Sequence, residues 1–124
     1  MEIRKELFYT KANIWVRFND NGTATVGITP YGKELFKKIN FINLCDEGET
    51  FSAYDIFGDV VTCCKGVFDL YAPIDGTVSC VNDELLDEPE KINDDPYGEW
   101  LVEFYNVRKT QRLLTAEEYE KFIK

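Results

Sequence analysis

Histidine is absent from the 124-residue sequence, and its four cysteines include no pair with CxxC spacing. A zinc site needs four ligands at suitable spacing, so we expect no metal centre. The sequence also lacks an apolar stretch long enough to span a membrane. Residues 1–6 contain no apolar segment of the kind found in signal peptides. We therefore expect a cytoplasmic protein with reduced thiols.

Basic residues are few: the sequence has 14 Lys and Arg and 23 Asp and Glu, which gives a net charge of −9. Nucleic-acid binding needs a concentrated basic surface, so this composition disfavours it. Apolar material, in contrast, is plentiful: 44% of the residues are hydrophobic and 15% are aromatic. That supply is enough for a core and favours strands over helices. The length suits a single domain, residues 1–124.

Turn signals divide the chain into about seven short segments with strand character. The clearest pair is 14–18 and 23–28, which an Asn-Asp-Asn-Gly turn joins into a hairpin. Five further strands are expected at 38–44, 54–62, 67–71, 77–81 and 100–105. The pattern predicts a mainly β fold, a small antiparallel sandwich or flattened barrel with short peripheral and C-terminal helices.

A first short helix is expected after the opening hairpin. Thr29 is a good N-cap residue, and Pro30 suits the first helical position because its missing N–H is not needed there. The helix body would cover 31–38, with Leu35 and Phe36 turned toward the core.

A second helix is expected at the carboxyl end of the chain. Thr115 with a glutamate three residues later resembles a capping box and predicts a helix through Ile123. The segment 82–97 is rich in Asp, Glu, Asn and Pro, so it predicts a long loop with at most one helical turn at 84–86.

A single charged residue, Lys65, interrupts two strand-like runs and is followed by Gly66. Because glycine tolerates positive φ, this pair can form the tip of a tight hairpin. A lysine on such a tip would present its amine to an acylating enzyme, and an attached cofactor would swing from a rigid base. On the pattern alone, an ordinary solvated lysine is the simpler interpretation.

Four motifs along the chain give a more specific indication of function. Residues 62–76, TCCKGVFDLYAPIDG, are similar to the lipoyl-lysine hairpin of glycine cleavage system H-proteins, usually written E-S-V-K-A-x-S-D-x-x-S-P-x-S-G. Residues 9–16, 22–29 and 93–101 resemble that family's Y-T-K-S-H-E-W-V, G-x-A-T-V-G-I-T and N-x-D-P-Y-G-E-G-W-L, the last with one glycine missing. The resemblance covers nearly the whole chain.

The resemblance implies a barrel-sandwich hybrid fold and a carrier that is not itself an enzyme. Its cofactor would be lipoate, covalently attached to Lys65 by a lipoate ligase that reads a surface including the positions of Thr62, Asp69 and Gly76. The arm would take the aminomethyl group of glycine from glycine decarboxylase and present it to an aminomethyltransferase. Dihydrolipoyl dehydrogenase would reoxidise it. We expect a monomer, since a swinging arm needs open access.

Three positions depart from the family pattern. Thr62 replaces a glutamate three residues before the lysine, Ile14 replaces a glutamate before the tryptophan, and Leu35 replaces a histidine that many members carry. Ile14 and Leu35 would offer the loaded arm an apolar groove in place of a polar seat, unless both pack in the core. Cys63 and Cys64 could exchange with a dithiolane, but strand alternation predicts that at least one of them points inward as a small apolar residue.

These departures leave two alternative functions open. One is an H-like lipoyl carrier that serves a redox-stress or sulfur-transfer system. The other is a scaffold module that keeps the fold and carries no lipoyl group.

Overall fold

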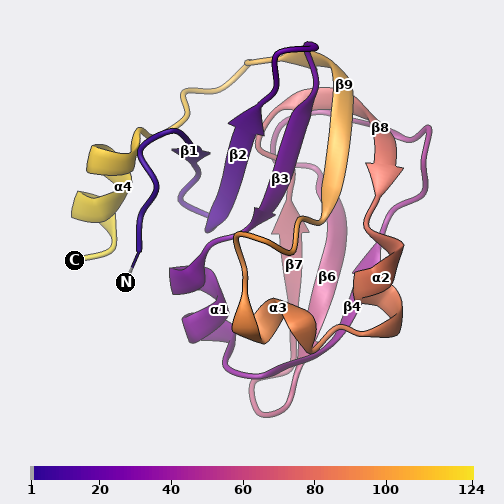
Figure 1. Cartoon of the computed structure of the whole chain (residues 1–124), viewed down its shortest axis with the longest axis vertical. Coiled ribbons are helices and arrows are strands. Elements are labelled where there is room, and N and C mark those ends of the chain that lie inside the picture. The colour runs from indigo at the N-terminus through magenta and orange to yellow at the C-terminus, as the bar shows by residue number, and fades with distance from the viewer. Residues whose placement is uncertain (1) are drawn as a thin grey trace.

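Two antiparallel sheets pack face to face in the computed structural model, which describes residues 2–124 (Figure 1). One sheet has six strands in the order β1-β2-β3-β9-β8-β5, and the other has three in the order β4-β6-β7. Within the described residues the strands are β1 (Phe8–Tyr9), β2 (Ile14–Phe18), β3 (Ala24–Ile28), β4 (Ile39–Leu44), β5 (Thr50–Phe51), β6 (Ile56–Thr62), β7 (Val67–Tyr71), β8 (Asp75–Val81) and β9 (Val102–Arg108). The predicted sandwich is confirmed, and the two sheets do not close into a barrel.

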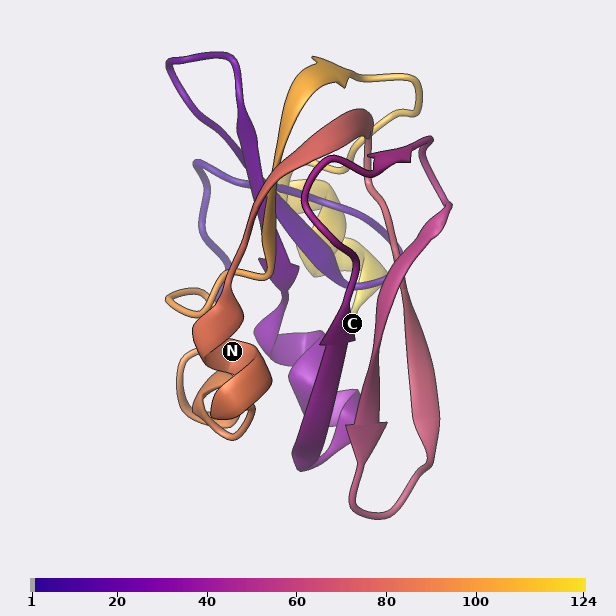
Figure 2. The ribbon, with the colours of Figure 1, turned by 90° about the vertical axis from the view of Figure 1, so that its right-hand side faces the viewer.

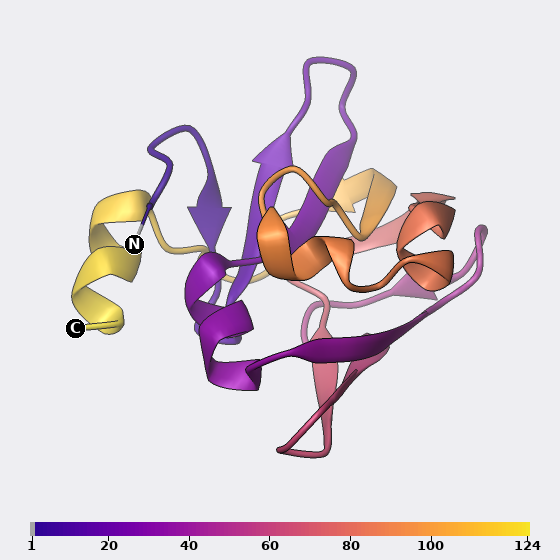
Figure 3. The ribbon, with the colours of Figure 1, turned by 60° about the horizontal axis from the view of Figure 1, so that its bottom comes forward.

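Four short helices lie around the sheets: α1 (Pro30–Phe36), α2 (Asp83–Asp87), α3 (Lys91–Asp94) and α4 (Ala116–Phe122). The helices α1, α2 and α3 gather at one end of the sandwich, and α4 lies beside the N-terminal residues at its side (Figures 1 and 3). Among residues 2–124 no helix has the length and apolar character that crossing a membrane requires.

The main core lies between the sheets and is built from the inward-facing residues of their strands. Strand alternation supplies it: Val60 and Leu70 project from the smaller sheet, and Val26, Val78 and Phe104 from the larger one, all at most 1% exposed. Burial of this apolar surface is the main force that holds the two sheets together. The smaller sheet, which contains the β6–β7 hairpin, is therefore held firmly against the larger sheet.

The helix α1 begins as predicted but presents one apolar side chain inward, not two. The Thr29 hydroxyl accepts a hydrogen bond from the Gly32 amide at 3.0 Å, and Pro30 takes the first helical position. Phe36 is buried, whereas Leu35 is 45% exposed, so its predicted inward orientation was wrong. A helix of seven residues with Phe36 in the core directs the neighbouring position outward.

The segment expected to be a long loop contains α2 and α3. Each has one buried anchor, Leu85 in α2 and Ile92 in α3. Asn93 then closes the segment onto β4: its side-chain amide donates to the Ile39 carbonyl at 3.1 Å and accepts from the Ile39 amide at 3.0 Å. The asparagine thus acts as a strand partner for the first residue of β4.

Three tyrosines fix α4 to the six-stranded sheet. Tyr119 stacks on Tyr9 with ring centroids 4.6 Å apart, and its hydroxyl lies 2.7 Å from the Thr29 hydroxyl and donates to the Asn13 side chain. The hydroxyls of Tyr9 and Tyr97 lie 3.3 Å apart. The predicted capping box at Thr115 is confirmed, so both the start and the inner face of this helix are fixed.

The tyrosine cluster predicts a loss of stability at alkaline pH. Burial raises the pKa of Tyr119 to about 12, and it raises those of Tyr9 and Tyr97. A tyrosine with a raised pKa stabilises the fold fully below its unfolded value of about 10. That contribution is lost as the pH rises through the folded value. We expect the free energy of unfolding to fall between about pH 10 and about pH 12.

The Tyr119→Phe variant should show a shallower fall, by up to about 1.4 kcal/mol per pH unit. Chemical denaturation at several pH values measures the slope of the free energy of unfolding against pH. Tyr105→Phe, which alters an exposed tyrosine, is the matched control and should keep the original slope. Identical slopes for both variants would contradict the assignment to Tyr119.

Candidate functional site

The β6–β7 hairpin extends beyond the rest of the molecule, and its tip is the lowest part of the ribbon in Figures 1, 2 and 3. The strands pair from Ile56 opposite Tyr71 to Val61 opposite Val67. The Thr62 amide then donates to the Gly66 carbonyl at 2.9 Å and closes the turn. Gly66 has a φ of +89°, which explains the requirement for glycine. The predicted hairpin tip is confirmed.

Lys65 is exposed at this tip. Its side chain takes part in none of the ion pairs found among residues 2–124. Its amine is therefore accessible to an enzyme from outside, and the two-stranded base behind it restrains its backbone. These are the geometric requirements for an acylated lysine that carries a cofactor arm.

Thr62 stabilises the turn through the hydrogen bonds of its side-chain hydroxyl. Its hydroxyl accepts from the Lys65 amide at 3.0 Å and donates to the Gly66 carbonyl at 3.0 Å, and the residue is 7% exposed. Sequence reasoning placed Thr62 on the surface that a ligase reads. The structure instead shows Thr62 buried, with its hydroxyl hydrogen-bonded within the turn.

Thr62→Val should therefore loosen the tip. Loss of one hydrogen bond of about 1 kcal/mol corresponds to amide exchange about fivefold faster at Lys65. Hydrogen exchange followed by NMR measures this, and Thr62→Ser should restore the slow rate. Equal exchange in the Val and Ser variants would show that the hydroxyl does not hold the turn.

Asp69 and Gly76, the other two predicted recognition residues, lie in different environments. Asp69 is exposed on β7, opposite Asp59 of β6, on the outer face of the smaller sheet. Gly76 is buried in β8, where an added Cβ would lie 3.0 Å from the Phe104 side chain. Gly76 therefore allows close packing against β9 and is buried there.

The structure does not form the apolar groove that Ile14 and Leu35 suggested. Ile14 is 1% exposed and belongs to the main core, whereas Leu35 points outward from α1. The loss of the family's glutamate at position 14 is thus accommodated by burial. Neither residue lines the cavity between α1, α3 and the start of β4.

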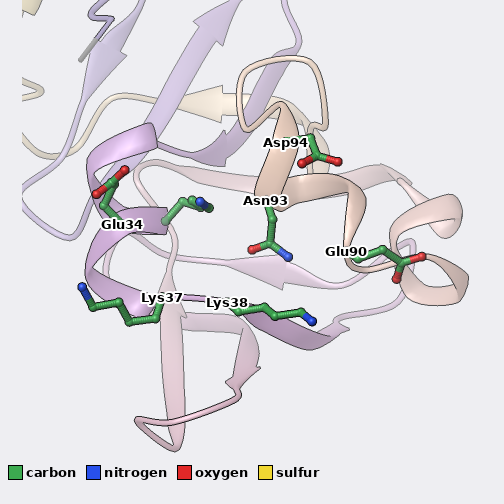
Figure 4. Close-up of a pocket in the computed structure, with 7 residues that line it drawn as sticks. Glu34, Lys37, Lys38, Glu90, Asn93 and Asp94 are labelled. Carbon is green, nitrogen blue, oxygen red and sulfur yellow. The ribbon is translucent and has the colours of Figure 1, made fainter.

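A cavity of about 420 Å³ lies between α1, α3 and the start of β4 (Figure 4). Side chains of both charge signs line it: Lys33, Glu34, Lys37, Lys38, Glu90, Asn93 and Asp94. The turn of the hairpin begins next to it, since the Cys63 amide donates to the Lys38 carbonyl at 3.0 Å. Lys37 has a φ of +65°, a conformation unusual for a residue other than glycine. Sequence reasoning missed this cavity, because its lining comes from segments far apart in the chain.

Cys63 and Cys64 are both exposed in the turn, and their sulfur atoms lie 2.7 Å apart. The hydrogen bond between the two thiols raises the pKa of Cys64. Strand alternation suggested that one of them points inward, and the structure shows that neither does. The reason is that β6 ends at Thr62, so alternation no longer applies to the two cysteines.

Comparison with known proteins agrees with this geometry. The family model described as Glycine cleavage H-protein matches residues 7–124. The chain is 43% identical over 124 residues to the glycine cleavage system H protein of Lachnoclostridium phytofermentans, covering 100% of this chain and 97% of the relative. It is 40% identical to that of Thermoanaerobacter sp., over 99% of this chain and 98% of the relative.

The crystal structure of a glycine cleavage system H protein from Mycobacterium marinum is also similar. It has a TM-score of 0.87 and 35% sequence identity, over 96% of this chain and 97% of that one. The family match spans the Lys65 hairpin, both sheets and α4 alike. The chain therefore belongs to the glycine cleavage H-protein family.

Proposed function

We propose that this protein is the lipoyl carrier of a glycine cleavage system and that Lys65 is the residue to which the lipoyl group is attached. The observation that carries the proposal is the exposed lysine at the tip of a hydrogen-bonded hairpin, in a chain of this family. The names of its relatives favour this function over a carrier for a redox-stress or sulfur-transfer system. No feature of the described residues specifically favours a scaffold without a lipoyl group.

The residues of the hairpin fit the attached group. The Lys65 amine would form the amide linkage, Gly66 would permit the turn, and Thr62 would hold the lysine backbone in place. When attached, the lipoyl group supplies a dithiolane that carries the aminomethyl group. The protein contributes position and reach and performs no catalytic step of its own. A tethered arm raises the effective concentration of its load at each partner enzyme.

The partners that we propose are glycine decarboxylase, an aminomethyltransferase, dihydrolipoyl dehydrogenase and a lipoate ligase. Of the three recognition residues predicted near the lysine, only Asp69 is exposed. We propose that its carboxylate contacts the ligase. The outer face of the smaller sheet around Asp69 carries both apolar and polar side chains. An apolar row and a polar row cross the three strands side by side: Phe41, Val61 and Val67, and Asn43, Asp59 and Asp69.

Asp69→Asn should slow lipoylation by the ligase about tenfold, the value of one charge-assisted hydrogen bond. Stability should not fall, because the change removes repulsion between two carboxylates on facing strands. The matched control is Asp59→Asn, which relieves the same repulsion and keeps Asp69. The initial rate of lipoate incorporation measures the effect. Equal rates in the two variants would exclude Asp69 as a ligase contact.

The function itself is tested by exchange of labelled bicarbonate into the carboxyl group of glycine, with glycine decarboxylase present. Fully lipoylated protein should support exchange, and unlipoylated protein should not. If fully lipoylated protein supported no exchange with several decarboxylases, a carrier role in another system would replace the proposal.

A further inference from the structure

The turn that carries Lys65 also carries two adjacent thiols that the carrier role does not use. Cys63 and Cys64 are both exposed, and their sulfur atoms are 2.7 Å apart, against about 2.05 Å in a disulfide bond. The turn holds them there, since the Cys63 amide donates to the Lys38 carbonyl, and Thr62 bonds both Lys65 and Gly66. A small displacement would bring the two sulfurs to bonding distance.

The other two cysteines provide an internal contrast. Cys45 is half-buried, and burial raises its pKa to about 11. The pKa of Cys64 is raised too, by the neighbouring thiol, so the pair differs from Cys45 in its exposure to solvent. Cys80 is exposed on β8 but has no cysteine beside it. Among the four cysteines, only the pair in the turn combines access to solvent with a second sulfur within reach, and that second sulfur is what resolves a mixed disulfide.

We propose that Cys63 and Cys64 form a thiol–disulfide exchange site whose substrates are small disulfides. A free linear disulfide oxidises the pair, and, if the proposed function holds, the dithiol of a reduced arm on Lys65 attacks the Cys63–Cys64 bond in the reverse sequence and closes to the dithiolane. In the first reaction the thiolate of one cysteine attacks a substrate sulfur and forms a mixed disulfide, and the displaced sulfur leaves as a thiolate and takes up a proton. The second cysteine then attacks the first. The Cys63–Cys64 bond forms, and the remaining substrate sulfur leaves as a second thiol.

The exchange is balanced in electrons and protons. Two protein thiols are oxidised to one disulfide, and one substrate disulfide is reduced to two thiols, with no further oxidant. The protein disulfide should be easy to reduce, because the Cα atoms of neighbouring residues are only about 3.8 Å apart. Relaxed disulfides usually span about 4.4–6.8 Å. A reduced arm should therefore return the pair to the dithiol form.

The first test uses unlipoylated protein with Cys45→Ser and Cys80→Ser, so that only the pair remains. The reduced protein is mixed with excess oxidised glutathione, quenched with acid and analysed by intact mass. We expect loss of two hydrogens with no glutathione retained. The matched Cys63→Ser and Cys64→Ser variants should each retain one glutathione. Retention of glutathione by the pair, or no reaction at all, would overturn the proposal.

The second test takes the oxidised protein from the first test, removes the glutathione and adds one equivalent of dihydrolipoamide, the free form of the reduced arm. Peptide mapping at equilibrium should find the cysteine pair reduced, with the disulfide transferred to the lipoamide. A pair that stays oxidised beside unreacted dihydrolipoamide would refute the expected direction of exchange. Because the first test needs no lipoyl group, a failure of the proposed carrier function would not be mistaken for a failure of the exchange site.

Discussion

Lys65→Arg should reduce glycine–bicarbonate exchange to the level seen with no carrier present. Arginine keeps the positive charge and the length of the side chain, but its guanidinium does not form the amide that anchors a lipoyl group. Lys65 makes no ion pair within residues 2–124, so stability should be unchanged. The loss should be complete, since an untethered cofactor loses the high local concentration that the arm provides.

The matched control is Lys109→Arg, which alters another exposed lysine. It should keep both the lipoyl group and full exchange. Exchange should be assayed together with the thermal melting temperature, so that loss of function is separated from loss of fold. Residual exchange by Lys65→Arg above the carrier-free level would mean that a second lysine accepts the lipoyl group.

Gly27→Ala should cause a large loss of stability from a single added methyl group. Gly27 lies opposite Trp15 in the β2–β3 pair, and its added Cβ would overlap the indole ring, lying 2.6 Å from Nε1. Trp15 is 1% exposed and donates from Nε1 to the Pro96 carbonyl at 3.1 Å. The ring cannot move without breaking this hydrogen bond, so the cost is about 2–4 kcal/mol.

Gly48→Ala is the control for Gly27→Ala. Gly48 has a φ of +90° with nothing within 4 Å of an added Cβ, so only backbone strain of about 1 kcal/mol applies. Replacing Trp15 by Phe in the Gly27→Ala background should recover part of the loss, because the smaller ring makes room. Denaturant titration measures all four proteins. A cost for Gly27→Ala no greater than that for Gly48→Ala would contradict the packing described.

Local signals predicted the parts of the fold that local chemistry determines. The strand at Ile14–Phe18, the strand at Val67–Tyr71 and the cap at Thr115 were all predicted, because alternation, turn residues and capping spacing act within a few residues. The strands β1 and β5 were missed, because two residues hold no periodicity and gain their pairing only from distant partners.

In the candidate site, too, some features follow from neighbouring residues and others depend on distant ones. The position of Lys65 at a hairpin tip followed from its neighbours and Gly66. The burial of Ile14 and Gly76 did not, because it depends on packing between elements far apart in the chain. The role of Thr62 inside the turn is local in sequence, yet the resemblance obscured it by directing attention to the family's glutamate at that position.

Peptide mapping of the protein after lipoylation by a lipoate ligase tests the central claim most directly. Tandem mass spectrometry should find one lipoyl group per chain, on the lysine between Cys64 and Gly66. A lipoyl group on any other lysine, or none after full activity of the ligase on a known acceptor, would contradict the account.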